Sequence, residues 1–223
     1  MLILNLVRKT ARVNGATSVF LALAATFGLA GCQLGATDPA MRGRELFATC
    51  AACHGPAGAG IRALGAPGIA GVKEPYIELQ LRKFRTGVRG TQFNDIEGMR
   101  MRPMALSLRD DNDLKAVATY VAGLPAVRNA LTIQGNAQAG QALYAVCIPC
   151  HGADGSGNEA LMAPRLAGMD DWYLATELRN YKNGVRGINP RDTQGLLMVP
   201  MVKTLVDDEA IRNVVAYIET LRP

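Results

Sequence analysis

The sequence predicts an all-α protein made of two small tandem domains. The chain aligns with itself at a shift of 97 residues, Gly43–Leu124 onto Gly140–Leu221, without a gap. One fixed offset of this length indicates duplication of a whole domain, because solenoid repeats are shorter and more numerous. Apolar residues also recur at helical spacing behind capping residues, and no segment shows the sustained alternation of a strand.

Three helices are expected in each domain. In the first domain they run from about Pro39 into Cys50, from Pro75 to Gly87, and from near Asp111 to Gly123. In the second domain they run from about Ala137 into Cys147, from after Asp170 to Gly184, and onward from near Asp207. We place the domains at residues 42–125 and 138–223, with residues 126–137 as the linker, where proline, asparagine and glycine interrupt the periodicity.

Both histidines of the chain and four of its five cysteines lie in two copies of one motif. The copies are Cys50-Ala-Ala-Cys53-His54 and Cys147-Ile-Pro-Cys150-His151. This spacing lets one helical turn present two thiols to the vinyl groups of a porphyrin while the next residue offers an imidazole to the iron. A zinc site would need four ligands, and a redox dithiol would need no adjacent histidine. The motifs therefore predict two covalently bound haem c groups, with His54 and His151 as iron ligands.

The sixth iron ligand must come from another residue type, because the motifs use both histidines. Methionine is the leading candidate, since its soft thioether sulfur favours ferrous iron and raises the reduction potential. Two methionine pairs occupy equivalent places in both domains: Met101 with Met198, and Met104 with Met201. Both pairs are expected in a proline-containing loop before the last helix, and the spacing alone leaves the choice open.

The order of motifs in each half resembles that of class I cytochromes c. It runs from Cys-x-x-Cys-His through Gly-x-Gly, Pro-x-hydrophobic-Ala-Gly and a tyrosine-led helix to a methionine that precedes a leucine and an acidic helix start. The duplication makes the chain similar to the dihaem cytochrome c4 family over nearly everything after about Arg42. In that family the ligand methionine lies seven residues before the leucine, here Leu108 or Leu205. The resemblance therefore favours Met101 and Met198, and leaves Met104 and Met201 to pack beside the haem.

The resemblance also implies roles for residues outside the motifs. Pro67 and Pro164 would each turn a backbone carbonyl toward the second ring nitrogen of the histidine, unless they are ordinary turn prolines. Tyr76 and Tyr173 could reach a haem propionate, or be core tyrosines. Basic residues that could neutralise propionates are Arg85 and Lys182, or Arg89 and Arg186.

The two haem surroundings are expected to differ. Trp172 stands where the first domain has Pro75, and the acidic pair Asp170-Asp171 stands where it has Lys73-Glu74. These differences in packing and charge predict two unequal reduction potentials.

The N-terminus predicts export and a lipid anchor. Three basic residues precede the uncharged stretch Ala16–Gly31, which ends in Leu-Ala-Gly-Cys32. This ending resembles a bacterial lipobox, so residues 1–31 are interpreted as a signal peptide and residues 32–41 as a tether acylated at Cys32. The alternative is an uncleaved anchor helix, although the apolar stretch is short for a membrane span. Either interpretation places the domains on the periplasmic side of a bacterial membrane.

The charge of the chain gives no reason to expect a nucleic-acid partner. Removal of the signal peptide reduces the formal charge of +5 to +2, with 21 basic and 19 acidic residues. The resemblance implies an electron carrier without a small-molecule substrate. Its redox partners would be a membrane donor, such as a quinol-oxidising complex, and a terminal oxidase or reductase. A permanent subunit of a larger respiratory or dehydrogenase complex is the alternative.

The competing class is an enzyme, either a dihaem peroxidase or a thiosulfate-oxidising cytochrome. Such enzymes commonly need histidine or cysteine ligands beyond the haem motifs. This chain has no spare histidine, and its one spare cysteine is Cys32.

Overall fold

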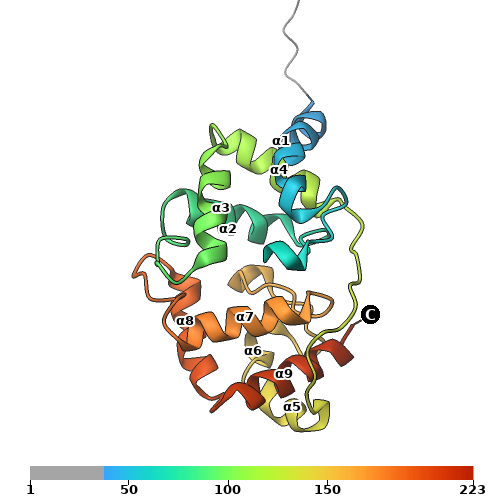
Figure 1. Cartoon of the computed structure of the whole chain (residues 1–223), viewed down its shortest axis with the longest axis vertical. Helices are drawn as coiled ribbons and strands as arrows, with labels where there is room; N and C mark the ends of the chain where they lie inside the picture. The colour runs from blue at the N-terminus through green and yellow to red at the C-terminus, as the bar shows by residue number, and fades with distance from the viewer. Residues whose placement is uncertain (1–37, 223) are drawn as a thin grey trace, which may run out of the picture. The chain divides into compact units, whose positions relative to one another are not determined.

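The computed structural model describes residues 38–222. The predicted signal peptide and the acylated Cys32 lie outside the described residues. Within them the fold is all-α, as predicted, with no strand beyond two isolated β-bridges (Figure 1). The helices are α1 (Pro39–His54), α2 (Glu74–Arg85), α3 (Ile96–Leu106), α4 (Asp111–Ala122), α5 (Ala137–Tyr144), α6 (Ile148–His151), α7 (Asp171–Lys182), α8 (Thr193–Lys203) and α9 (Asp208–Thr220), with short 3₁₀ turns at Arg62–Leu64 and Glu159–Leu161.

Side-chain caps explain where most of these helices begin. An aspartate or asparagine precedes the helix and accepts a hydrogen bond from a backbone N–H of the first turn, which would otherwise lack a partner. The residues that cap their own helix in this way are Asp38, Asp95, Asp110, Asn136, Asp192 and Asp207.

Each domain buries the first and last of its helices against each other. In the first domain α1 packs on α4, and in the second α5 packs on α9. Glycine permits this close approach. A Cβ atom at Gly43 would lie 2.2 Å from the carbonyl oxygen of Ala116, and one at Gly140 would lie 1.9 Å from that of Asn213. Any side chain at either glycine would therefore push the paired helices apart.

The predicted loop around the methionine pairs is wrong, because both pairs lie on helices. Met101 and Met104 are on α3, and their equivalents are on α8. Each helix contains a proline, Pro103 or Pro200, which led us to expect a loop. The helices form nonetheless, with an aspartate capping each N-terminus, although each proline has no N–H to donate to the carbonyl four residues back.

The first helix of the second domain is also shorter than predicted. Helix α5 ends at Tyr144, three turn residues follow, and a separate helix α6 carries the motif. In the first domain, by contrast, α1 runs through the motif to His54.

The extended segment between α4 and α5 (Figure 1) is bound to the second domain in its later part. The backbone N–H groups of Thr132 and Ile133 donate to the Asp171 carboxylate, and that of Asn136 donates to Asn213 Oδ1 at 2.7 Å. Among residues 38–222, no helix has the length and apolar character needed to cross a membrane.

Candidate functional site

The histidine of each motif is the last residue of a helix and is followed by a glycine. His54 ends α1 and His151 ends α6, and the following residues, Gly55 and Gly152, have φ angles of +76° and +80°. This left-handed region is open to glycine at little cost, so the chain turns away directly after each histidine.

The four motif cysteines are free thiols in the structure. Cys53 and Cys150 are exposed, whereas Cys50 and Cys147 are half-buried. Burial raises the pKa of Cys50 and raises that of Cys147 to about 11. Reactive dithiols have thiols of lowered pKa, so the direction of these shifts argues against a redox-active disulfide.

The two histidines have the same surroundings. His54 Nδ1 lies 2.8 Å from the carbonyl oxygen of Pro67, and His151 Nδ1 lies 2.9 Å from that of Pro164. Because a carbonyl only accepts, Nδ1 carries the proton and Nε2 keeps its lone pair for a metal. Both rings are buried, and this burial lowers the pKa of each imidazole, which favours the neutral form that ligates iron.

The candidate methionines differ in exposure. Met101 and Met198 are half-buried, and Met198 packs against the core of the second domain. Met104 and Met201 are 39% and 40% exposed.

The other predicted site residues lie on α2, α7 and the loops that follow them. Tyr76 and Tyr173 are half-buried in the first turns of α2 and α7. Of the basic candidates, Arg85 pairs with Asp111, and Lys182 donates to the carbonyl oxygen of Leu205.

Arg89 and Arg186 are buried, and each has an N–H group without a hydrogen-bond partner among the described residues. Arg89 stacks over the Phe84 ring at 4.5 Å and Arg186 over the Tyr181 ring at 4.7 Å. In the described part of the chain, neither Nε–H has a hydrogen-bond partner. A buried guanidinium N–H without a partner is costly, and a propionate would satisfy it. These orphaned donors and the imidazole geometry both fit a haem in each domain.

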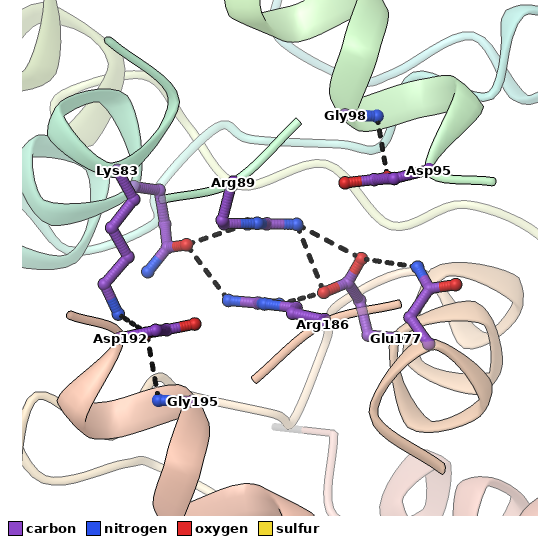
Figure 2. Close-up of polar contacts among 10 residues, drawn as sticks. Lys83, Arg89, Asp95, Gly98, Glu177, Arg186, Asp192 and Gly195 are labelled. Carbon is purple, nitrogen blue, oxygen red and sulfur yellow. Dashed lines mark hydrogen bonds and ion pairs between the residues drawn. The ribbon is translucent and has the colours of Figure 1, made fainter. Parts of the chain in front are cut away.

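The same two arginines join the domains, which sequence reasoning did not find (Figure 2). Arg89 donates to Gln80 at 2.7 Å and to Glu177 at 3.3 Å, while Arg186 donates to Gln80 at 3.0 Å and to Glu177. Each arginine thus bonds to one residue of its own domain and one of the other. The sequence signal for this network is the segment Gly-Val-Arg-Gly, which occurs at residues 87–90 and again at 184–187. From the sequence alone, its arginines are predicted only to contact propionates.

A buried ion pair adjoins this network. Lys83 Nζ lies 2.5 Å from Asp192 Oδ1, and both side chains are almost fully buried (Figure 2). Burial lowers the pKa of Lys83, and the bond to Asp192 opposes that effect.

The fold and the paired sites define a tandem haem-c protein. A family model described as cytochrome c matches residues 40–125 and again residues 137–222, so the chain belongs to the cytochrome c family. It carries two covalently bound haem c groups, which the two Cys-x-x-Cys-His motifs fit.

Comparisons over most of the chain name similar proteins. The chain is 32% identical over 72% of its length to a thiosulfate dehydrogenase electron acceptor from Stutzerimonas stutzeri, covering 73% of that protein. The structure of reduced cytochrome c4 from Pseudomonas stutzeri aligns with a TM-score of 0.63 and 26% identity, over 81% of this chain and 97% of that one.

A thiosulfate dehydrogenase (TsdBA) from Marichromatium purpuratum aligns with a TM-score of 0.65 and 31% identity over 83% of this chain. The present chain spans 40% of that protein's length. Together the matches identify a dihaem electron carrier with the domain pairing of cytochrome c4.

Proposed function

We propose that the chain is a lipid-anchored carrier on the periplasmic side of a bacterial membrane. It takes electrons from a membrane donor, such as a quinol-oxidising complex, and delivers them to a terminal oxidase or reductase. The proposed layout is a signal peptide (1–31), a tether acylated at Cys32 (32–41), two haem domains (42–125 and 138–223) and a linker (126–137). An anchor suits this role because it raises the local concentration of the carrier near its membrane partners.

The observation that carries the proposal is the matched pair of sites, each with one histidine and one candidate methionine. In each domain a buried histidine is fixed through Nδ1 by a proline carbonyl, and a half-buried methionine lies on the helix before the last one. We assign His54 and Met101 to the first iron, and His151 and Met198 to the second. Their lower exposure supports this methionine pair over Met104 and Met201.

Other residues of the chain hold the group and set its properties. Thioether bonds would form at Cys50 and Cys53 in the first domain, and at Cys147 and Cys150 in the second. The Pro67 and Pro164 carbonyls fix the imidazole rings and increase their basicity as ligands.

Tyr76 and Tyr173, with Arg89 and Arg186, are suited to bind the propionates. Each bound haem supplies a one-electron change at its iron. If His54 and Met101 hold one iron and His151 and Met198 the other, the protein would leave neither iron free to bind and activate a substrate, so we assign the chain no catalytic reaction.

One comparison supports a different electron donor. A relative 32% identical over 72% of this chain is named as the electron acceptor of thiosulfate dehydrogenase. By this likeness the donor would be a thiosulfate dehydrogenase instead of a quinol-oxidising complex. Mixing the oxidised carrier with each purified donor and following haem reduction by stopped flow would identify the physiological route, since that donor should reduce it at least tenfold faster than the other.

The ligand assignment is tested by substitution. Ferric haem with a methionine ligand has a weak charge-transfer band in the red. This band should fall by half in Met101→Ala and in Met198→Ala, and vanish in the double variant. The matched control is the pair Met104→Ala and Met201→Ala, which should leave it intact. Loss of the band in the control pair, with retention in the first, would reverse the assignment.

The anchor is tested at Cys32. A Cys32→Ser variant should lose labelling by a radioactive fatty acid and leave the membrane fraction. If it stays membrane-bound with Met1 as its N-terminus, the uncleaved-helix interpretation is correct.

A further inference from the structure

Asp170 occupies the N-cap position of α7, but its side chain does not cap that helix. It precedes α7 as the N-cap residue, and its backbone carbonyl accepts from Leu174 N at 3.0 Å. Its carboxylate makes no bond to the first turn of α7. The six side chains that cap other helices do make such a bond. The side chain of Asp170 is therefore engaged elsewhere.

The Asp170 carboxylate reaches into the first domain. Oδ2 accepts a hydrogen bond from the backbone N–H of Gly68 at 2.7 Å, and Oδ1 accepts one from Asn129 Nδ2, also at 2.7 Å. The same Asn129 nitrogen lies 2.7 Å from the carbonyl oxygen of Ala59. Asp170 is 7% exposed, so these partners replace most of its water.

The Gly68 amide belongs to the peptide group that holds the first histidine. The carbonyl of this Pro67–Gly68 peptide accepts from His54 Nδ1 at 2.8 Å, while its N–H donates to Asp170 at 2.7 Å. A chain of two hydrogen bonds therefore joins a carboxylate of the second domain to the imidazole of the first.

The second domain lacks this arrangement. The residue equivalent to Gly68 is Arg165, and in the described part of the chain its backbone N–H bonds to no side chain. The residue equivalent to Asp170 is Lys73, which pairs with Glu159 at 2.8 Å. Lys73 and Glu159 border a small cavity that Pro164 and Arg165 also line. Equivalent positions thus bring a carboxylate to one histidine-binding peptide and an ammonium group near the other.

We infer that Asp170 is a positioning residue that tunes the first haem from the other domain, lowering its reduction potential relative to that of the second. The inference rests on the proposed ligation by His54. A carboxylate at the N–H end polarises the peptide and makes its carbonyl a stronger acceptor. The Nδ1–H bond then strengthens, the imidazole becomes a more basic ligand, and the ferric state is stabilised.

The Coulomb effect has the same sign. A buried negative charge near the first iron favours its oxidised, more positive state. The sequence places Asp170 in the second domain, whereas its contacts assign it to the haem of the first. The lower potential therefore belongs to the first haem, and an electron arriving at either site rests mainly on the second.

The test compares Asp170→Asn with a matched control, Asp207→Asn. Both substitutions remove one negative charge from a helix-capping aspartate of the second domain, but Asp207 caps only α9 and has no contact with Pro67–Gly68. The readout is the distribution of one electron between the two haems at half reduction, resolved by the paramagnetically shifted NMR signals of each haem.

In Asp170→Asn we expect this distribution to move at least threefold toward the first haem, equivalent to about 28 mV for a one-electron couple. The ¹H resonance of the Gly68 amide should move upfield as its bond weakens. Asp207→Asn should change the distribution by less than a third of that amount.

A second variant separates charge from packing. Asn129→Ala removes the neighbouring contacts but leaves the bond between Gly68 and Asp170, so it should leave the distribution within experimental error of the wild type. An equal shift in Asn129→Ala, or in Asp207→Asn, would overturn the inference by showing a structural or long-range charge effect. The wild-type spectra test the ligation separately: absence of two low-spin haem signals would refute the proposed ligation, whereas normal spectra without the shift would refute the role of Asp170 alone.

Discussion

The two domains reach the same haem-binding geometry by different helices. In the first, one 16-residue helix runs through the motif, whereas in the second an eight-residue helix and a four-residue helix are separated by a turn. The cause is Pro149, which stands where the first domain has Ala52. Proline has no N–H to donate to the carbonyl four residues back, and its ring clashes there. It is tolerated because the new helix begins just before it.

The interruption between α5 and α6 leaves the contacts of the histidine unchanged. The distance from Nδ1 to the proline carbonyl is 2.8 Å in one domain and 2.9 Å in the other. Gly60 N–H donates to the His54 carbonyl at 2.8 Å, and Gly157 N–H to that of His151 at 2.9 Å. The site is therefore fixed by the loop from histidine to proline, and the helix that leads into the motif is free to vary.

The two domains differ more in the charged residues at their contact than in their helices. Lys83 pairs with the buried cap Asp192, but the equivalent residues are Asn180 and Asp95, and Asn180 bonds weakly to Glu177 at 3.5 Å (Figure 2). Duplication gave two copies of each surface, so an ion pair between the domains requires some equivalent positions, such as 83 and 180, to carry different residues.

Removal of the buried lysine should have the largest effect on stability. Lys83→Met leaves the Asp192 carboxylate buried without its partner, a change that costs roughly 3–5 kcal/mol. The matched variant Asn180→Met loses one long hydrogen bond and should cost less than about 1 kcal/mol. Guanidinium denaturation of the ferric protein, followed by circular dichroism, measures both. Equal losses would show that the ion pair contributes nothing specific.

The next largest effect on stability should come from exchanging Ala52 and Pro149, the equivalent residues between the two cysteines of each motif. Ala52→Pro places a proline in the interior of α1 and should cost about 3 kcal/mol. Pro149→Ala should allow α5 and α6 to fuse and leave stability the same or slightly higher, with more helix by circular dichroism. Haem attachment should persist in Pro149→Ala. If Pro149→Ala prevents attachment, the helix break is part of the site.

The pH dependence of stability should differ between the domains because of Glu219, whose equivalent in the first domain is Ala122. Burial raises the pKa of Glu219 to about 7, aided by Asp171 and Asp170 and opposed by Arg222. The folded state holds this proton more tightly than the unfolded state, whose ordinary value is 4.5. The stabilisation is therefore complete below pH 4.5 and is lost as the pH rises through 7.

Glu219→Gln should remove this pH dependence and, above pH 7, exceed the wild type in stability by on the order of 1–2 kcal/mol after allowance for solvent screening. Denaturation midpoints at pH 5, 6, 7 and 8 test it. A variant less stable than the wild type at pH 8 would show that the pair with Arg222 outweighs the burial of the charge.

The sequence was most informative where local signals agree. Helices α2, α4 and α7 were predicted within about two residues, because capping residues, apolar periodicity and terminal glycines point to the same bounds, and the start of α9 was predicted from its cap. Helices α3 and α8 were missed because an internal proline and mixed exposure hide their pattern. The motif fixes the cysteines and histidines, since covalent attachment requires that spacing.

The contacts between the two domains could not be predicted from the sequence. The offset of 97 residues shows which residues are equivalent, but not which residues face each other between the domains. Asp170 illustrates this limit: it belongs to the second domain by sequence and contacts the histidine-binding peptide of the first. Distances between domains depend on packing, which a one-dimensional alignment does not encode.

Carbon monoxide binding tests the central claim of two closed iron sites most directly. With His54 and Met101 on one iron and His151 and Met198 on the other, the fully reduced protein should bind negligible carbon monoxide at neutral pH, and the oxidised protein should show no appreciable peroxidase turnover. A single Met101→Ala variant should bind one equivalent, which calibrates the assay. Stoichiometric binding to one haem of the unmodified protein would reveal an open site, contradict the account and favour the enzyme interpretation.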